Sequence, residues 1–204
     1  SPTALGGKVL RVTTDGTAAP GNNPPTGFDR RIFTYGHRNV QGISFQPGTG
    51  RAFIGEHGPN HSDEVTMLEN GGNGGWDPQN RTGLGCPDGY CGYSGSFTSM
   101  PMTDLARFPS ALRPAWTNNG SSQGMGPVAF LSGSHWGRWN GRLAVGIMSG
   151  SRVEILELNS AGSAISTANS GLPSVRYRAL TLAPDGSLYI VTDAGEIWRV
   201  TSTP

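Results

Sequence analysis

The chain has 204 residues, of which 35% are hydrophobic and 14% charged, a balance that supports a folded domain and excludes a disordered chain. Its formal net charge is +1, and Lys8 is its one lysine, so no basic stripe exists for a nucleic-acid backbone. No apolar run approaches the roughly 20 residues of a membrane span, and the first residues lack the layout of a signal peptide. We therefore expect a soluble chain whose export signal has been removed.

Glycine and proline are frequent, at 32 and 15 residues, and no long amphipathic helical stretch lies between them. This composition predicts an all-β fold in which many short strands are joined by tight turns. The first strand is expected at residues 8–14, KVLRVTT, where apolar and polar residues alternate before an Asp15-Gly16 turn. A loop rich in proline, asparagine and glycine follows, to about Asp29.

A first antiparallel meander is expected between residues 31 and 69. Its first apolar run is residues 31–36, and residues 42–58 contain two short strands around a Pro-Gly-Thr-Gly turn. Residues 63–69, DEVTMLE, supply the next strand.

Residues 70–123 are rich in glycine, proline, serine and asparagine and show few alternating runs. Connections of this length are uncommon in compact domains, so we interpret the segment as a functional excursion. It contains Cys86 and Cys91, separated by proline and glycine turns, and we predict a disulfide between them, which implies an oxidising compartment. Two free thiols are the alternative, whereas a zinc site lacks further ligands at suitable spacing.

Two further meanders follow the excursion, at residues 127–159 and 178–203, the last with Pro-Asp-Gly and Asp-Ala-Gly turns. Repetition of this unit favours a β-propeller, because each hairpin must bury both faces against neighbouring hairpins. We therefore predict a single domain over residues 1–204 with about three blades. A β-sandwich of short Greek-key strands is the alternative.

Polar side chains suited to a planar, carbonyl-rich anion are concentrated at residues 35–42, YGHRNVQG. An imidazole, a guanidinium and two carboxamides lie within five positions between two predicted strands. Arg38 offers a planar fork of donors, and Asn39 and Gln41 offer both donors and acceptors. The alternative is a polar turn whose side chains cap their own backbone.

A second polar segment, residues 55–64, combines a Gly58-Pro59 turn with several carboxylates. Backbone carbonyls and carboxylates are hard oxygen ligands of the kind that calcium prefers. A solvated acidic turn is one alternative, and zinc at His57 and His61 is another. Zinc is disfavoured because the proline between the two histidines opposes the helix that would place them on one face.

The stretch from Tyr35 to Trp76, YGHRNVQGISFQPGTGRAFIGEHGPNHSDEVTMLENGGNGGW, resembles the most distinctive segment of the soluble PQQ-dependent glucose and aldose sugar dehydrogenases, also described as glucose/sorbosone dehydrogenases. The resemblance continues through residues 136–146 and 175–200. It implies a six-bladed β-propeller that holds pyrroloquinoline quinone (PQQ) and calcium at the top of the ring. It also implies that this chain is the C-terminal part of such a ring.

The resemblance implies six cofactor contacts, from Arg38, Asn39, Gln41, His57, Arg176 and Arg178. Arg38 and Asn39 would lie near the carbonyl that accepts hydride and would stabilise developing oxyanion charge. Arg176 and Arg178, two apart and so on one side of a strand, would pair with the PQQ carboxylates. An exposed strand face is the alternative for these two arginines.

The resemblance also implies two calcium sites. The backbone carbonyls of Gly58 and Pro59 would bind the calcium that polarises the quinone as a Lewis acid. Glu64 and the carbonyl of Gly74 resemble part of a second, structural calcium site.

Three departures from the family pattern stand out. Residues 147–152, IMSGSR, replace a lysine that contacts the cofactor, so this contact is lost or passes to Arg152. Residues 121–127 follow the cofactor-covering loop only loosely. The general base of the family is a histidine of the first half of the propeller, and no position of this chain matches it.

Oxidation of an aldose sugar at its anomeric carbon, by hydride transfer to PQQ, is the function that the resemblance implies, with this chain supplying part of the site. The alternatives are a non-catalytic extracellular binding module and a structural half-ring. The polar cluster favours the enzyme, because a scaffold needs none of it. We further expect a secreted or periplasmic protein that self-associates or pairs with an N-terminal half, since three blades would expose apolar faces.

Overall fold

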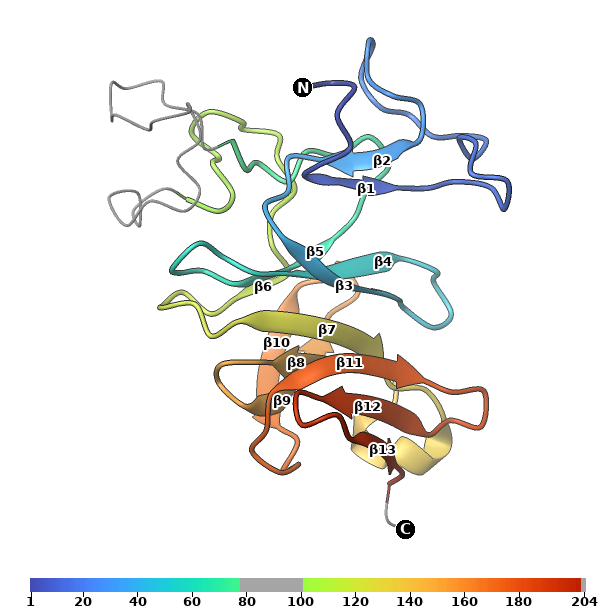
Figure 1. Cartoon of the computed structure of the whole chain (residues 1–204), viewed down its shortest axis with the longest axis vertical. Helices are drawn as coiled ribbons and strands as arrows, with labels where there is room; N and C mark the ends of the chain where they lie inside the picture. The colour runs from blue at the N-terminus through green and yellow to red at the C-terminus, as the bar shows by residue number, and fades with distance from the viewer. Residues whose placement is uncertain (78–100, 203–204) are drawn as a thin grey trace. The chain divides into compact units, whose positions relative to one another are not determined.

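Residues 1–77 and 101–202 are described by the structure, a computed structural model of the chain (Figure 1). In these ranges the chain forms short strands, and all named strands pair in antiparallel fashion. The one helical segment of the described residues is the 3-10 helix η2 (Ser134–Trp139). The predicted all-β fold is therefore confirmed.

Two compact units make up the chain. The first comprises Ser1–Asn39 and Leu68–Arg113, and the second Val40–Met67 and Pro114–Pro204. The single domain over residues 1–204 stays a prediction. Within the residues that the structure describes, no helix is both long enough and apolar enough to cross a membrane.

The first unit contains a two-stranded sheet of β1 (Lys8–Leu10) and β2 (Ile32–Tyr35). β1 is shorter than the predicted run of residues 8–14, and its pairing register with β2 shifts between Val9 and Leu10. The residues after it turn back on themselves, and Val12 and Ala18 form an isolated bridge. The alternating pattern therefore continues into a small hairpin instead of lengthening the strand.

The second unit contains three antiparallel sheets, each built from strands that are consecutive in the sequence. The first sheet has the order β3 (Val40–Phe45), β4 (Ala52–Glu56), β5 (Glu64–Met67) and β6 (Trp116–Thr117). The second has the order β7 (Met125–Phe130), β8 (Leu143–Ile147), β9 (Arg152–Leu158) and β10 (Ala164–Asn169). The third has the order β11 (Tyr177–Leu182), β12 (Leu188–Thr192) and β13 (Ile197–Val200).

Two strands of these sheets were not expected from the sequence. β6 lies inside residues 70–123, the predicted excursion, and β10 follows the second predicted meander. Both are edge strands, and β10 is largely exposed. An exposed edge strand needs no alternating apolar face, so the hydrophobic pattern did not reveal them.

The middle sheet, β7 to β10, has its first two strands buried along their whole length. One side of this sheet packs in a core with Phe53 and Val65 of the first sheet. The other side packs with Leu180 and Ile190 of the third sheet. This sheet therefore buries both faces against its neighbours, as the propeller prediction requires.

The first strands of the three sheets, β3, β7 and β11, lie beside one another (Figure 1). Glycines permit a close approach between their backbones. A Cβ added at Gly42 of β3 would lie 2.7 Å from the backbone nitrogen of Val128, and one at Gly126 of β7 would lie 3.2 Å from the carbonyl oxygen of Tyr177. This packing is typical of the inner strands of adjacent propeller blades, whereas the six-bladed ring and the blade count stay predictions.

Candidate functional site

The turn that carries His37 and Arg38 belongs to the first unit. The His37 side chain is buried, with 4% of its surface exposed, and its Nε2 lies 2.8 Å from the hydroxyl oxygen of Thr34. The His37 backbone N–H donates to the carbonyl oxygen of Gly7 at 3.1 Å. His37 therefore anchors the turn and fixes the chain directly before Arg38.

Arg38 lines a cavity of about 570 Å³ in the first unit. The aromatic residues of its wall are Phe28, Tyr35, Trp76 and Phe108. The Arg38 guanidinium carbon lies 5.9 Å from the centre of the Trp76 ring, within cation–π range. A cationic, aromatic cavity of this kind suits a planar anion.

Three of the predicted quinone contacts lie close together in the sequence but belong to different units. Arg38 and Asn39 end the first segment of the first unit, and Gln41 lies on β3 of the second. Gln41 is exposed, as are Ile43 and Phe45, which follow it at every second position. Their joint role as a ligand site stays a prediction.

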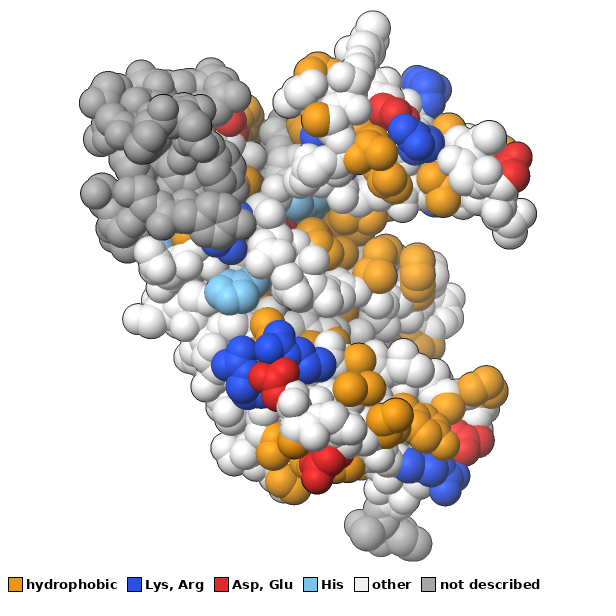
Figure 2. All heavy atoms as spheres, in the orientation of Figure 1, with side chains coloured by type: hydrophobic (Ala, Val, Ile, Leu, Met, Phe, Trp, Pro, Cys, Tyr) orange, Lys and Arg blue, Asp and Glu red, His pale blue; other side chains and the backbone are white. Residues whose placement is uncertain are grey.

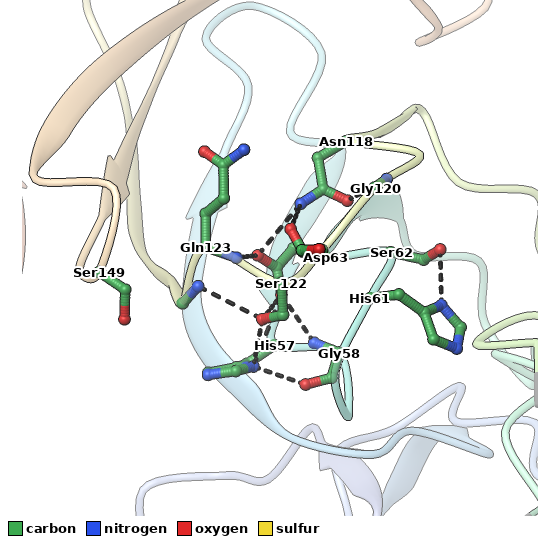
Figure 3. A network of polar contacts seen from close by, with 12 residues as sticks. His57, Gly58, His61, Ser62, Asp63, Asn118, Gly120, Ser122, Gln123 and Ser149 are labelled. Carbon is green, nitrogen blue, oxygen red and sulfur yellow. Dashed lines mark hydrogen bonds and ion pairs between the residues drawn. The ribbon is translucent and has the colours of Figure 1, made fainter. Parts of the chain in front are cut away.

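The predicted calcium turn follows β4 in the second unit, and Figure 3 shows its polar contacts. His57 Nδ1 lies 2.7 Å from the carbonyl oxygen of Gly58. A Cβ at Gly58 would lie 1.9 Å from the carbonyl oxygen of His61, so the close return of the chain requires glycine there. The rings of His57 and His61 point away from each other in Figure 3, an arrangement that does not suit a shared zinc ion.

Asp63 is the residue of this site that the sequence analysis missed. It is 1% exposed, and its carboxylate accepts hydrogen bonds from three segments of the chain. The donors are the Gly58 N–H at 2.9 Å, the Ser122 hydroxyl at 2.7 Å, the Gln123 N–H at 2.7 Å and the Asn118 amide at 3.5 Å. No local pattern could reveal this role, because three of the four donors come 55 to 60 residues later in the chain.

Ser122, His57 and Asp63 are the residue types of a hydrolase triad, but their geometry differs from one. The Ser122 hydroxyl donates to Asp63, and its oxygen lies 3.2 Å from His57 Nδ1. In a triad the imidazole lies between serine and carboxylate and takes the serine proton. Here serine and imidazole both adjoin the carboxylate, with His57 Nδ1 at 3.5 Å, so the network supports the turn instead of activating a nucleophile.

Arg176 and Arg178 lie together on the carboxylate of Asp193. Arg176 Nε lies 2.5 Å from Asp193 Oδ2, and Arg178 donates to Asp193 through both Nε and Nη2, the latter at 3.1 Å. The two side chains are 44% and 46% exposed. Figure 2 shows basic side chains gathered around an acidic one on this face of the second unit.

This ion pairing shifts the titration of the groups concerned. The hydrogen bond from Arg178 is the main cause that lowers the pKa of the Asp193 carboxyl, and Arg176 lowers it further, against a partial rise from desolvation. The hydrogen bond to Asp193 raises the pKa of Arg178. Two guanidinium groups on one carboxylate leave a net positive, accessible surface.

The loop after β8 is the segment that the sequence analysis expected to replace a cofactor-contacting lysine, an expectation that stays a prediction. Arg152 pairs with Glu154, through Nε at 2.7 Å and Nη2 at 2.6 Å. Its guanidinium is thus held by its own strand, and a contact with a ligand would compete with this pair. The same loop approaches the arginine pair, since Arg176 Nη1 lies 3.5 Å from the Ser149 hydroxyl oxygen.

The predicted structural calcium site pairs Glu64, which is buried at the start of β5, with Gly74 of the first unit. Because the two residues belong to different units, this site stays a prediction. Among the residues that the structure describes, no three imidazole, thiolate or carboxylate groups gather into a metal site. Cys86 and Cys91, the predicted disulfide, lie outside the described residues.

Comparisons with known proteins agree with the resemblance seen in the sequence. A family model described as glucose/sorbosone dehydrogenase matches residues 1–199. The aldose sugar dehydrogenase of Escherichia coli strain K12 is 28% identical over 205 residues, which cover 96% of this chain and 51% of that protein. Quinoprotein glucose dehydrogenase B of Acinetobacter calcoaceticus is 39% identical over 103 residues, which cover 50% of this chain and 21% of that protein.

The fold is also similar to that of a solved protein. A crystal structure of glucose dehydrogenase superposes with a TM-score of 0.77 at 26% identity, over 97% of this chain and 55% of that one. The chain thus spans about half the length of this structure and of the Escherichia coli protein.

Proposed function

Because the chain belongs to the glucose/sorbosone dehydrogenase family, we propose that it supplies part of the site of a PQQ- and calcium-dependent enzyme that oxidises an aldose at its anomeric carbon. The Acinetobacter relative is by name a quinoprotein, and the Escherichia coli relative is by name an aldose sugar dehydrogenase. The observation that carries the proposal is the exposed pair of Arg176 and Arg178 on Asp193.

The arginine pair fits a ligand with several carboxylates. Arg176 and Arg178 each keep almost half of their side-chain surface exposed while Asp193 holds them in place. Guanidinium groups bind carboxylates through paired, charge-assisted hydrogen bonds. Together the two arginines would hold the carboxylates of PQQ and fix its orientation.

The turn at Gly58 and Pro59 fits a hard cation. Its carbonyl oxygens are the ligand type that calcium prefers, and the buried carboxylate of Asp63 lies directly behind the turn. A negative charge in this position favours a cation at the neighbouring carbonyls. We therefore assign the calcium beside PQQ to Gly58 and Pro59, and a structural calcium to Glu64 and Gly74.

When bound, PQQ would supply the hydride acceptor that no side chain can provide. Arg38 and Asn39 would donate hydrogen bonds to its carbonyl oxygens, Gln41 would add a further polar contact, and His57 would lie beside it. The resemblance implies that the family base is a histidine of the first half of the propeller, so we propose that turnover requires a base supplied by that half.

A binding experiment tests this proposal. PQQ titrated into the 204-residue chain in calcium buffer should change its absorbance on binding, and excess chelator should weaken the binding. The double variant R176A/R178A should bind at least about tenfold more weakly, because two charge-assisted contacts are lost. R199A is the matched control, since Arg199 is also exposed and paired with a carboxylate, that of Asp185.

Three outcomes separate the alternatives. Binding without reduction of PQQ on addition of glucose would support a site that lacks its base. Equal affinity in the double variant and the control would contradict the arginine assignment. Absence of PQQ binding in the unaltered chain would favour the non-catalytic module.

A further inference from the structure

We infer that Asp63 is a positioning residue, whose carboxylate holds the turn at Gly58 and Pro59 and the segment at Ser122 and Gln123 in one conformation competent to bind calcium. The calcium part of this inference rests on the proposed function. The positioning part rests on the hydrogen bonds of Figure 3 alone.

Each carboxylate oxygen of Asp63 accepts hydrogen bonds from two donors. Oδ1 accepts from the Gly58 N–H and the Ser122 hydroxyl, and Oδ2 accepts from the Gln123 N–H and the Asn118 amide. In addition, the Asn118 N–H donates to the Asp63 carbonyl oxygen at 3.2 Å. A carboxylate that is 1% exposed is costly to bury unless it is hydrogen-bonded, so this arrangement is strongly preferred once the chain folds.

Gly58 is fixed at both of its backbone polar groups. Its N–H donates to Asp63 at 2.9 Å, and its carbonyl oxygen lies 2.7 Å from His57 Nδ1. The chain then returns through Ser62, whose φ of 56° lies in the left-handed region that non-glycine residues rarely adopt. A turn with such a residue persists only if its surroundings hold it, and Asp63 directly follows Ser62.

Asp63 also places a negative charge behind the turn. His57 Nδ1 lies 3.5 Å from the Asp63 carboxylate, and no arginine or lysine of the described residues pairs with it. A cation bound at the Gly58 and Pro59 carbonyls would gain from this charge. Residues behind a metal site commonly set its affinity in this way without touching the metal.

Replacement of Asp63 by asparagine tests the inference with little change in shape. In either orientation the new NH₂ group faces a backbone N–H, that of Gly58 or that of Gln123, which cannot accept a hydrogen bond. The variant D63N should therefore release one or both segments. Asp185, an exposed carboxylate paired with Arg199, provides the control variant D185N.

Two measurements are made on the 204-residue chain. Amide hydrogen exchange at Gly58 and Gln123, followed by NMR in chelator, should be at least about tenfold faster in D63N and unchanged in D185N. Calcium affinity, measured by calorimetry with the metal alone, should fall at least about tenfold in D63N. If D63N does not fold, S122A, which removes one donor to Asp63, should still lower calcium affinity measurably.

Unchanged exchange in D63N would overturn the inference, and so would faster exchange with unchanged calcium affinity. If D63N is unfolded, unchanged calcium affinity in S122A would overturn it as well. Failure of the unaltered chain to bind calcium would contradict the proposed calcium site instead. The exchange comparison, which contains no calcium, would still decide whether Asp63 holds the two segments.

Discussion

Arg176 and Arg178 illustrate how a single acidic residue can hold two arginine side chains together. Asp193 lies 17 residues after Arg176 and 15 after Arg178, and it draws both guanidinium groups to one point. Fixing two long side chains before a ligand arrives lowers the conformational entropy that binding costs. Asp193 would thus prepare the arginine pair for carboxylates, at the cost of competing with them.

The titration of Asp193 provides a prediction at this scale. The carboxyl should titrate below its ordinary pKa of 3.8, and R178A should raise that pKa more than R176A, because Arg178 is the main cause of the shift. Folding lowers this pKa, so the ion pairs stabilise the folded state fully when the pH is above the pKa of Asp193 in the unfolded chain. Their contribution is lost as the pH falls through the lower pKa of the folded state. An NMR pH titration that finds a midpoint near 3.8 in the unaltered chain would contradict the pairing.

Strands β3, β7 and β11 depend on glycine where they meet. At Gly42 an added Cβ would lie 2.7 to 3.1 Å from three backbone atoms of Pro127 and Val128. Backbone atoms cannot rotate away as a side chain can, so the strands would have to separate. The spacing between the first two sheets therefore depends on the absence of a side chain at Gly42.

Substitution of Gly42 by alanine should destabilise the chain by about 1–3 kcal/mol, the usual cost of inserting a methyl group into a packed interior. Urea unfolding followed by circular dichroism measures this loss. G120A is the matched control, because a Cβ at Gly120 would meet one atom at an ordinary 3.6 Å. Equal stability of the two variants would show that β3 and β7 are not packed as described.

At the scale of the whole molecule, the three sheets of the second unit leave large apolar side chains exposed, among them side chains of β3 and β13. Ile43 and Phe45 of β3 are 46% and 63% exposed, and Ile197 of β13 is 72% exposed. Exposed apolar surface of this kind often marks an interface. A propeller would cover it with the neighbouring blades on either side.

We therefore expect the 204-residue chain to self-associate, or to bind an N-terminal half of the propeller when one is supplied. Light scattering at micromolar concentration should give a mass above that of the monomer, and the double variant F45S/I197S should shift it towards the monomer. T181S, a small change within β11, serves as the control. A monodisperse monomer in the unaltered chain would show that these apolar residues need no partner.

The sequence by itself predicted the all-β fold, most strands of the three meanders and the family, because alternation, turn residues and the segment from Tyr35 to Trp76 are local in the chain. The first predicted meander was wrong in one part, since residues 31–36 form β2, which pairs with β1 in a separate sheet. The tertiary structure decided which residues meet. It buried His37 as an anchor, paired Arg152 with Glu154, and placed Asp63 against donors from residues 118–123. The physical reason is that a hydrogen bond depends on position in space, and folding brings together groups that no pattern of neighbouring residues connects.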